Sequence, residues 1–111
     1  MGKFIKGDVV VIPFPFSDLS TSKRRPALVL AGLTGNDIIL CQVTSKAVSD
    51  EYAVPLLTHD FNEGSLNQDS NIRPNRLFTA DESIIVYKAG AINNNKLGMA
   101  IDKIIEILAK A

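Results

Sequence analysis

Three apolar segments in the first half of the chain have the composition of β-strands. Residues 9–16 (VVVIPFPF) and 37–44 (DIILCQVT) are rich in β-branched or aromatic side chains, and residues 26–31 (PALVLA) form a shorter apolar run. A proline cannot donate a ladder hydrogen bond, so Pro13 and Pro15 predict that the first strand ends or lies at a sheet edge there. The pattern predicts antiparallel strands joined by tight connections.

The second half of the chain adds three shorter strand candidates. Residues 53–57 and 83–89 are mainly apolar, and residues 72–78 (IRPNRLF) alternate apolar and basic side chains. Pro74 places the strand at 72–78 at an edge, and Gly90 ends the strand at 83–89. We therefore expect further strands that complete the same sheet.

The end of the chain has the period of a helix. Asn93 or Asn94 is a suitable N-cap for a helix over about residues 95–110. Its apolar stripe consists of Leu97, Ile101, Ile104, Ile105 and Leu108. Ala100 and Ile107 fall off this stripe, where either a dimer contact or extra core burial would explain them.

Polar segments separate the predicted elements. Residues 17–25 are mostly polar or charged and predict an exposed loop, Gly35 and Asn36 predict a turn, and a polar loop runs through residues 64–70. Together the elements predict a mainly β fold. In it, short antiparallel strands curl into a small barrel, and one C-terminal helix packs on them.

Composition and charge narrow the class of protein. Hydrophobic residues make up 46% and charged residues 22% of the 111 residues, as in a globular protein, and we expect one domain over residues 1–111. No apolar stretch approaches the roughly 18 residues of a membrane span. The N-terminus lacks the apolar run of a signal peptide, so we expect a cytoplasmic protein.

The net charge is zero, but the charges are unevenly distributed. Residues 1–25 carry five basic side chains, whereas residues 47–70 carry five acidic ones and no Lys or Arg. Such an arrangement suits a phosphate-bearing ligand on one face, and solvated loops produce it equally.

The numbers of cysteine and histidine residues and the absence of known motifs disfavour several kinds of catalytic and binding site. Cys41 is the only cysteine and is flanked by apolar residues, which predicts a buried core thiol. His59 is the only histidine and lies in a polar segment, so a pair of histidines is not available for acid–base catalysis. Zinc motifs and nucleotide-binding loops are absent, and we expect neither a metal nor a cofactor, although two scattered carboxylates would suffice for magnesium.

Cationic and hydroxyl side chains at two junctions remain as candidates. Lys23, Arg24 and Arg25 come directly before Pro26, which favours an extended backbone at Arg25 and so fixes the direction of its guanidinium. The second junction, at the end of the strand 37–44, holds Thr44, Ser45 and Lys46. Both groups have ordinary alternatives, namely a solvated basic loop and hydrogen bonding at a strand end.

The same residues resemble a known family. Residues 7–30 (GDVVVIPFPFSDLSTSKRRPALVL) are similar to the opening of MazF/PemK-type toxins of bacterial toxin–antitoxin systems. In these toxins a GD-[IV]-V strand leads to a Pro-Phe pair, a mobile loop and an R-P-[AV] strand start. Residues 40–46 (LCQVTSK), residues 72–81 (IRPNRLFTAD) and the closing helix resemble the PemK-like branch.

The resemblance implies an SH3-like (CcdB-like) β-barrel with a C-terminal helix, usually a homodimer, and a sequence-specific endoribonuclease that acts on mRNA. The family's catalytic arginine falls on Arg25 and its catalytic threonine on Thr44. The ribose 2′-hydroxyl would attack the adjacent phosphorus without a metal and leave a 2′,3′-cyclic phosphate and a 5′-hydroxyl. Arg25 would stabilise the charge that develops on the phosphate, and Thr44 would donate a hydrogen bond to the same oxygens. Arginine is a poor proton shuttle, which leaves the general acid and base open.

Other residues would bind the substrate and partners. Single-stranded RNA is the expected substrate class, and a cognate antitoxin with an acidic disordered tail is the expected protein partner. The candidate RNA-binding residues beyond the catalytic pair are Lys23, Arg24, Ser45, Lys46, Arg73, Arg76 and Phe16. Phe16, like Phe14 and Phe78, would stack on bases, although packing in the protein explains each phenylalanine as well.

Two rival functions share the predicted fold. A CcdB-like toxin would bind DNA gyrase, but that group relies on a tryptophan near its C-terminus, and this chain has none. A non-catalytic SH3-like binding module would lack the reaction altogether. The presence of both Arg25 and Thr44 favours the ribonuclease over the binding module.

Overall fold

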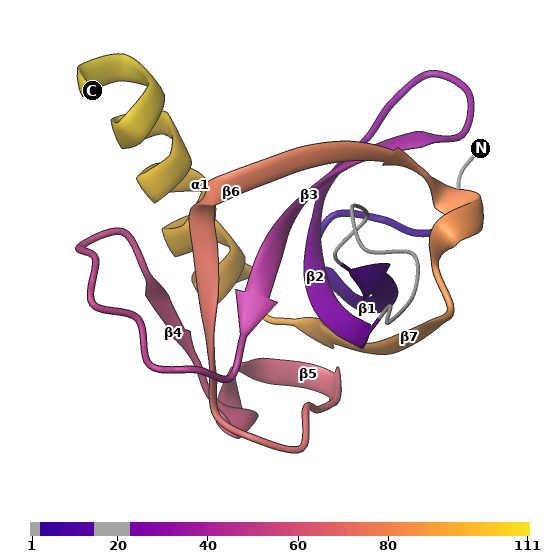
Figure 1. Cartoon of the computed structure of the whole chain (residues 1–111), viewed down its shortest axis with the longest axis horizontal. Helices are drawn as coiled ribbons and strands as arrows, with labels where there is room; N and C mark the ends of the chain where they lie inside the picture. The colour runs from indigo at the N-terminus through magenta and orange to yellow at the C-terminus, as the bar shows by residue number, and fades with distance from the viewer. Residues whose placement is uncertain (1–2, 15–22) are drawn as a thin grey trace.

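A computed structural model describes residues 3–14 and 23–111, which form a curled antiparallel sheet and a C-terminal helix (Figure 1). The strands are β1 (Asp8–Phe14), β2 (Lys23–Gly32), β3 (Asp37–Thr44), β4 (Val54–Leu56), β5 (Phe61–Gly64), β6 (Ser70–Asp81) and β7 (Tyr87–Ile92). Two short 3₁₀ helices, Thr58–Asp60 and Glu82–Ile84, and the helix α1 (Asn94–Lys110) complete the described chain. The strand order is β4-β6-β3-β2-β1-β7-β5. The predicted fold class, a mainly β barrel with a C-terminal helix, is confirmed.

Successive residues of the central strands alternate between two buried clusters, one on each face of the sheet. The first cluster contains Val9, Leu28, Cys41, Val43, Val54, Leu56, Ile72, Ile92, Leu97 and Ala100. The second cluster contains Val10, Ile12, Ala27, Val29, Ile38 and Leu40, with Phe4, Phe78, Ala80, Ile84 and Ile85 packed against it. Because both faces are covered, the strands have continuous apolar runs instead of a simple alternation of apolar and polar residues.

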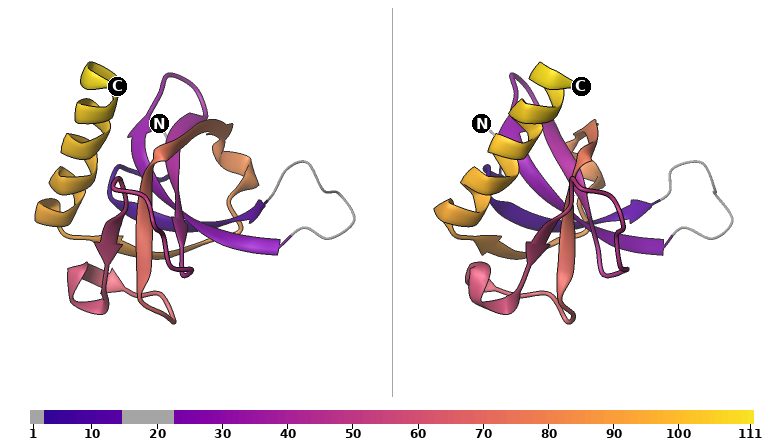
Figure 2. Two further views of the ribbon diagram at one scale, coloured as in Figure 1. Left: turned by 60° about the vertical axis from the view of Figure 1, so that its left-hand side comes forward. Right: turned by 90° about the vertical axis from the view of Figure 1, so that its left-hand side faces the viewer.

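The helix α1 packs on β4 and β6 through its first half (Figure 2). Asn93 is its N-cap, and the Asn93 side chain accepts a hydrogen bond from the backbone N–H of Lys96 at 2.7 Å. Ala100 is fully buried, so core packing explains it. The predicted stripe is only partly correct in the second half of the helix. Ile104 is half-buried, whereas Ile105 and Leu108 are 58% and 71% exposed, and Ile107, which falls off the predicted stripe, is half-buried.

The strand β2 begins earlier than predicted. Lys23, Arg24 and Arg25 belong to the strand and not to a loop, because they pair with the end of β1. Only residues 8–11 of β1 also pair with β7. Pro13 therefore lies where β1 has a neighbour on one side, as expected for a residue without an N–H.

The region around Gly90 differs from the prediction. The expected strand at 83–89 begins only at Tyr87, because Asp81 accepts a hydrogen bond from the N–H of Ser83 at 2.9 Å and starts a 3₁₀ turn. Gly90 continues β7 instead of ending it, and a Cβ there would collide with the backbone of Glu63 in β5. Strand β5 lies between the predicted strand at 53–57 and the predicted loop at 64–70, where no strand was predicted.

None of the helices in the described part of the chain is both long and apolar enough to span a membrane.

Candidate functional site

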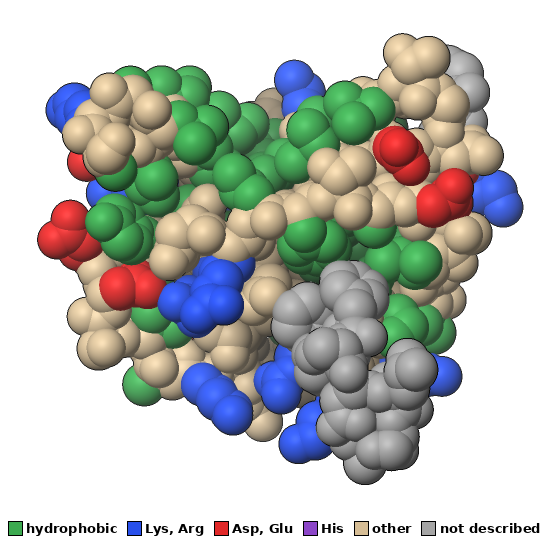
Figure 3. Space-filling model, turned by 45° about the horizontal axis from the view of Figure 1, so that its top comes forward, with side chains coloured by type: hydrophobic (Ala, Val, Ile, Leu, Met, Phe, Trp, Pro, Cys, Tyr) green, Lys and Arg blue, Asp and Glu red, His purple; other side chains and the backbone are tan. Residues whose placement is uncertain are grey.

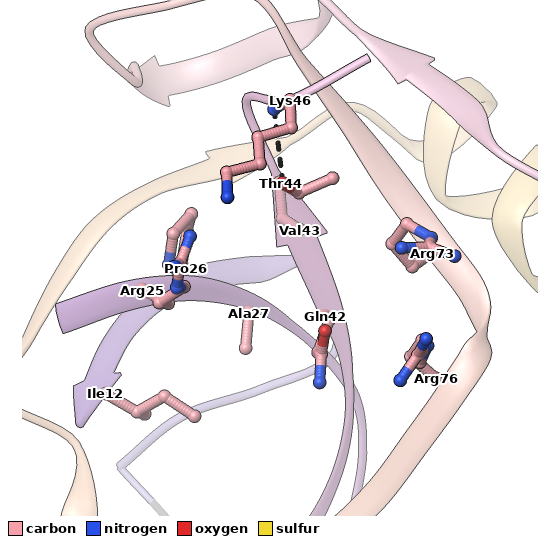
Figure 4. Close-up of a pocket in the computed structure, with 10 residues that line it drawn as sticks. All are labelled: Ile12, Arg25, Pro26, Ala27, Gln42, Val43, Thr44, Lys46, Arg73 and Arg76. Atoms are coloured by element: carbon pink, nitrogen blue, oxygen red, sulfur yellow. Dashed lines mark hydrogen bonds between the residues drawn. The ribbon is translucent and has the colours of Figure 1, made fainter. Parts of the chain in front are cut away.

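The polar side chains singled out by the sequence gather where β2, β3 and β6 extend beyond the second cluster. They surround a cavity of about 310 Å³ (Figure 4). We call it the main cavity, and it is lined by Ile12, Arg25, Pro26, Ala27, Gln42, Val43, Thr44, Lys46, Arg73 and Arg76. The apolar rows of the second cluster thus continue into a polar site on the same strands.

Arg25 and Thr44 lie on neighbouring strands and line the same cavity. The register pairs Ala27 with Gln42, and Arg25 and Thr44 each lie two residues beyond this pair, on the same face of the two antiparallel strands. The Oγ1 of Thr44 accepts a hydrogen bond from the N–H of Lys46 at 3.2 Å, which leaves the hydroxyl hydrogen free to donate to a ligand. Both side chains are half-buried and held by regular strands.

A bulge at residues 74–76 brings two arginines to one cavity. Arg73 pairs with Gln42 of β3, although an unbroken register would place Arg76 there. Side chains three positions apart point to opposite faces of a regular strand, but the bulge allows Arg73 and Arg76 to share the main cavity. Strand β6 pairs with β4 only at residues 70–72, so Pro74 lies past this pairing, where β6 has no strand on its β4 side, as a proline without an N–H requires. The expectation of an edge therefore holds at Pro74 itself, although the start of β6 lies between β3 and β4, and the buried Pro74 also occupies the bulge.

The main cavity is strongly basic. Arg25, Lys46, Arg73 and Arg76 line it, and no carboxylate does so among the described residues. Within residues 3–14 and 23–111, only Arg73 of these four cations has an acidic partner. Figure 3 shows Lys and Arg side chains gathered on the lower part of one face of the molecule. Uncompensated positive charge in a cavity attracts a polyanion.

Asp50 holds Arg73 from outside the cavity. Its Oδ2 lies 2.8 Å from Nη2 of Arg73, and its Oδ1 accepts hydrogen bonds from the N–H groups of Tyr52 and Ala53 at 3.0 and 3.1 Å. Desolvation raises the pKa of Asp50, but the Tyr52 and Arg73 hydrogen bonds outweigh it and the net pKa is lowered. The Nε of Arg73 is buried and has no hydrogen-bond partner in the described structure.

A second cavity of about 290 Å³ shares Arg25 and Thr44 with the main cavity. It adds Arg24 and Ser45, two predicted RNA-binding residues, together with Leu66, Asn67 and Gln68. Arg25 and Thr44 therefore stand between two adjoining hollows, which suits an extended ligand that passes over both.

Two predicted RNA-binding residues remain, and one of them is described by the structure. Lys23 is exposed at the start of β2 and lines neither hollow. Phe16 lies outside the described residues. Phe78 packs against the second cluster, in agreement with the packing explanation.

Other reactive side chains lie away from the site. Cys41 is buried, as predicted, and burial raises the pKa of its thiol to about 12, which disfavours a nucleophilic thiolate. His59 is exposed, and its Nε2 lies 3.6 Å from Oδ1 of Asp60. No cluster of three or more His, Cys, Asp or Glu side chains suited to a metal occurs in residues 3–14 and 23–111.

Gln42 is a cavity residue that the sequence analysis missed. It is half-buried, and it lies two residues before Thr44 on β3 and therefore on the same face. Gln42 alternates with Ile38, Leu40 and Thr44, so the sequence places it on the same face of the strand as Thr44. The sequence analysis did not single it out because the surrounding residues are mainly apolar.

Comparison with known families identifies the chain. The family model for the PemK-like, MazF-like toxin of type II toxin–antitoxin systems matches residues 5–108. The chain belongs to this family. Toxins of the MazF/PemK family are endoribonucleases, so the predicted family and enzyme class are confirmed.

Solved structures of MazF toxins share the fold of this family member. A MazE–MazF structure from Deinococcus radiodurans has a TM-score of 0.75 at 23% identity, and the match covers 96% of this chain and 97% of the other. MazF alone from the same organism has a TM-score of 0.73 at 24% identity, covering 95% and 96% of the two chains.

An endoribonuclease from Mycobacterial species has a TM-score of 0.73 at 12% identity, with coverage of 98% of this chain and 94% of the other. Identities this low show a common fold alone. No curated protein sequence matches the chain.

Proposed function

We propose that this toxin cleaves single-stranded mRNA in the main cavity without a metal. The observation that carries the proposal is the placement of Arg25 and Thr44 on adjacent strands, facing one cavity. Among the described residues, three further cations and no carboxylate line this cavity. This arrangement suits a phosphodiester whose negative charge increases during the reaction.

The proposed reaction is an attack by a ribose 2′-oxygen on the adjacent phosphorus. The new O2′–P bond forms as the P–O5′ bond breaks, the 2′-hydroxyl loses its proton, and O5′ gains one. The products are a 2′,3′-cyclic phosphate and a 5′-hydroxyl. Arg25 stabilises the charge on the non-bridging oxygens, and Thr44 donates a hydrogen bond to them while its Oγ1 is oriented by the N–H of Lys46.

The substrate path follows the basic residues on both sides of this pair. Lys46, Arg73 and Arg76 contact phosphates in the main cavity, and Arg24 and Ser45 do so in the second cavity. Lys23 extends the basic surface along β2. Phe16, which lies outside the described residues, stays a candidate for stacking on a base from the sequence alone. A single strand is favoured because its bases are unstacked and accessible to such a surface.

The proposed partners are a cognate antitoxin and a second copy of the chain. A relative from D. radiodurans is described as a MazE–MazF complex, and a Mycobacterial endoribonuclease as a complex with its cognate antitoxin. An acidic antitoxin segment would be attracted by the same basic cavity. Because its substrate is mRNA, we propose that the toxin acts in the cytoplasm.

The proposal is tested by incubating the purified protein with a long single-stranded RNA in excess EDTA. We expect cleavage with cyclic-phosphate ends, and we expect Arg25→Ala to reduce the rate on the order of 100-fold or more. End chemistry is read by phosphatase and kinase sensitivity of the fragments.

Two further variants control this experiment. Lys110→Ala removes an exposed cation from α1, and its rate should equal that of the wild type. Arg25→Lys keeps the charge but loses the planar fork, so it should remain strongly impaired. Intact RNA with the wild type, or equal cleavage by Arg25→Ala, would refute the proposed function.

A further inference from the structure

Gln42 differs in chemistry from the other polar residues of the main cavity. The cations and Thr44 offer donors that suit phosphate oxygens, whereas Gln42 is the only one of the described lining residues with a side-chain amide. Figure 4 shows Gln42 on β3, between Arg25 of β2 and the arginines of β6. Its position is central, and strands on both sides fix its backbone.

The amide of Gln42 is available to a ligand. It makes no hydrogen bond to any other described residue, although the side chain is half-buried. Its partner on the neighbouring strand β2 is Ala27, whose small side chain leaves room for a ligand beside the amide. A partly buried amide without a protein partner is satisfied by solvent or by a ligand that presents a donor and an acceptor.

We propose that Gln42 determines sequence specificity by reading a base next to the scissile phosphate. The inference rests on the proposed function, since it places the scissile phosphate at Arg25 and Thr44. Gln42 and Thr44 are two residues apart on one strand, or about 7 Å. A base that reaches Gln42 therefore belongs to a nucleotide that flanks this phosphate.

The chemistry of the amide favours a base over a second phosphate. A phosphate oxygen uses only the N–H donors of glutamine, whereas a base edge uses the donor and the acceptor together. Glutamine pairs in this bidentate way with the N6–H and N7 of adenine. Unstacked bases of single-stranded RNA expose such edges.

The test replaces the amide by a side chain of similar shape. Gln42→Met and the wild type cleave a pool of randomised RNA, and the bases around every cut are counted. We expect the variant to lose about 10-fold or more of the base preference at one position beside the cut. Preferences at the other positions should persist, because Arg25 and Thr44 are intact.

Asn62→Leu is the matched control, since it also replaces an amide by a hydrocarbon. Asn62 is exposed on β5 and does not line the main cavity, so its cleavage profile should match that of the wild type. An unchanged profile in Gln42→Met would overturn this inference and leave the proposed function standing. A wild type that cleaves no RNA would overturn both.

A binding measurement covers the case of an inactive Gln42→Met. Oligonucleotides with 2′-O-methyl groups cannot be cleaved, and their affinities are compared for the preferred sequence and for single-base changes beside the cut. The wild type should discriminate among them, and the variant should not. Equal discrimination by both proteins would overturn the inference.

Discussion

The second cluster and the main cavity occupy two regions of the same sheet face and differ in the chemistry of alternate residues. On β3, Ile38 and Leu40 are fully buried in the cluster, whereas Gln42 and Thr44 line the cavity. On β2, Val29 and Arg25 lie on the same face of the strand, but Val29 is buried in the cluster and Arg25 lines the cavity. Strands anchored in a core therefore carry Arg25, Gln42 and Thr44, which gives these side chains a rigid support.

This comparison predicts that substitutions in the two regions affect different properties of the protein. Substitutions in the cluster should lower stability, and substitutions in the cavity should lower activity. The four variants below test this separation.

The largest effect is expected in the core. Leu40→Ala removes a fully buried side chain and leaves a cavity, so the free energy of unfolding should fall by about 2–5 kcal/mol. Denaturant unfolding measures this loss. Cleavage per folded molecule should be preserved at low temperature, and a complete loss of activity in the folded protein would contradict the separation of the two regions.

A large effect on the cleavage rate is expected at Thr44, the last residue of β3. Thr44→Val keeps the shape of the side chain and removes the hydroxyl, so the cleavage rate should fall about 100-fold. The free energy of unfolding should change by no more than about 0.5 kcal/mol, because Thr44 is not part of the core. Single-turnover kinetics and unfolding curves provide the two readings.

Arg76→Ala should weaken RNA binding to a smaller extent. If Arg76 contacts one phosphate, its loss should reduce the slope of log affinity against log salt by about 0.7. Affinity for an uncleavable RNA at several salt concentrations measures the slope. The Lys110→Ala control should keep the slope of the wild type, and an unchanged slope in Arg76→Ala would exclude this contact.

The smallest effect is expected at Asp50, which touches the site only through Arg73. Asp50→Asn weakens the 2.8 Å ion pair, so KM for RNA should rise a few-fold with little change in kcat. In an Arg73→Ala background the same substitution should have no effect on KM. Equal effects in both backgrounds would show that Asp50 does not act through Arg73.

The same variant predicts a pH dependence of stability. Hydrogen bonds from Tyr52 and Arg73 hold the pKa of Asp50 below its ordinary value in the folded protein. Its contribution is therefore fully present above the unfolded pKa and is lost as the pH falls through the folded pKa. Unfolding of the wild type and Asp50→Asn should differ near neutral pH and converge in acid.

Strong local patterns made much of the fold predictable. Strand β3 has the predicted bounds because its apolar run is flanked by clear polar boundaries. The helix begins where Asn93 caps it, since capping is a local interaction. Arg25 and Thr44 were singled out by resemblance, and the antiparallel register explains why residues far apart in sequence share a cavity.

The remaining features depend on contacts between distant segments. Strand β5 forms only because it pairs with β7, where Gly90 permits the close approach of Glu63. The bulge at residues 74–76 aligns Arg73 with Arg76, and Pro74 alone did not distinguish a bulge from an edge. The role of Gln42 could be inferred only from the residues beside it on the neighbouring strands, Ala27 of β2 and Arg73 of β6.

The most direct test of the account is a single change in the substrate. An RNA oligonucleotide with one cleavage site is compared with the same oligonucleotide carrying a 2′-deoxyribose on the nucleotide whose 2′-oxygen would attack. The account predicts that the all-RNA strand is cleaved in EDTA and that the substituted strand stays intact at that site. Cleavage of the substituted strand at the same bond would contradict attack by the 2′-hydroxyl.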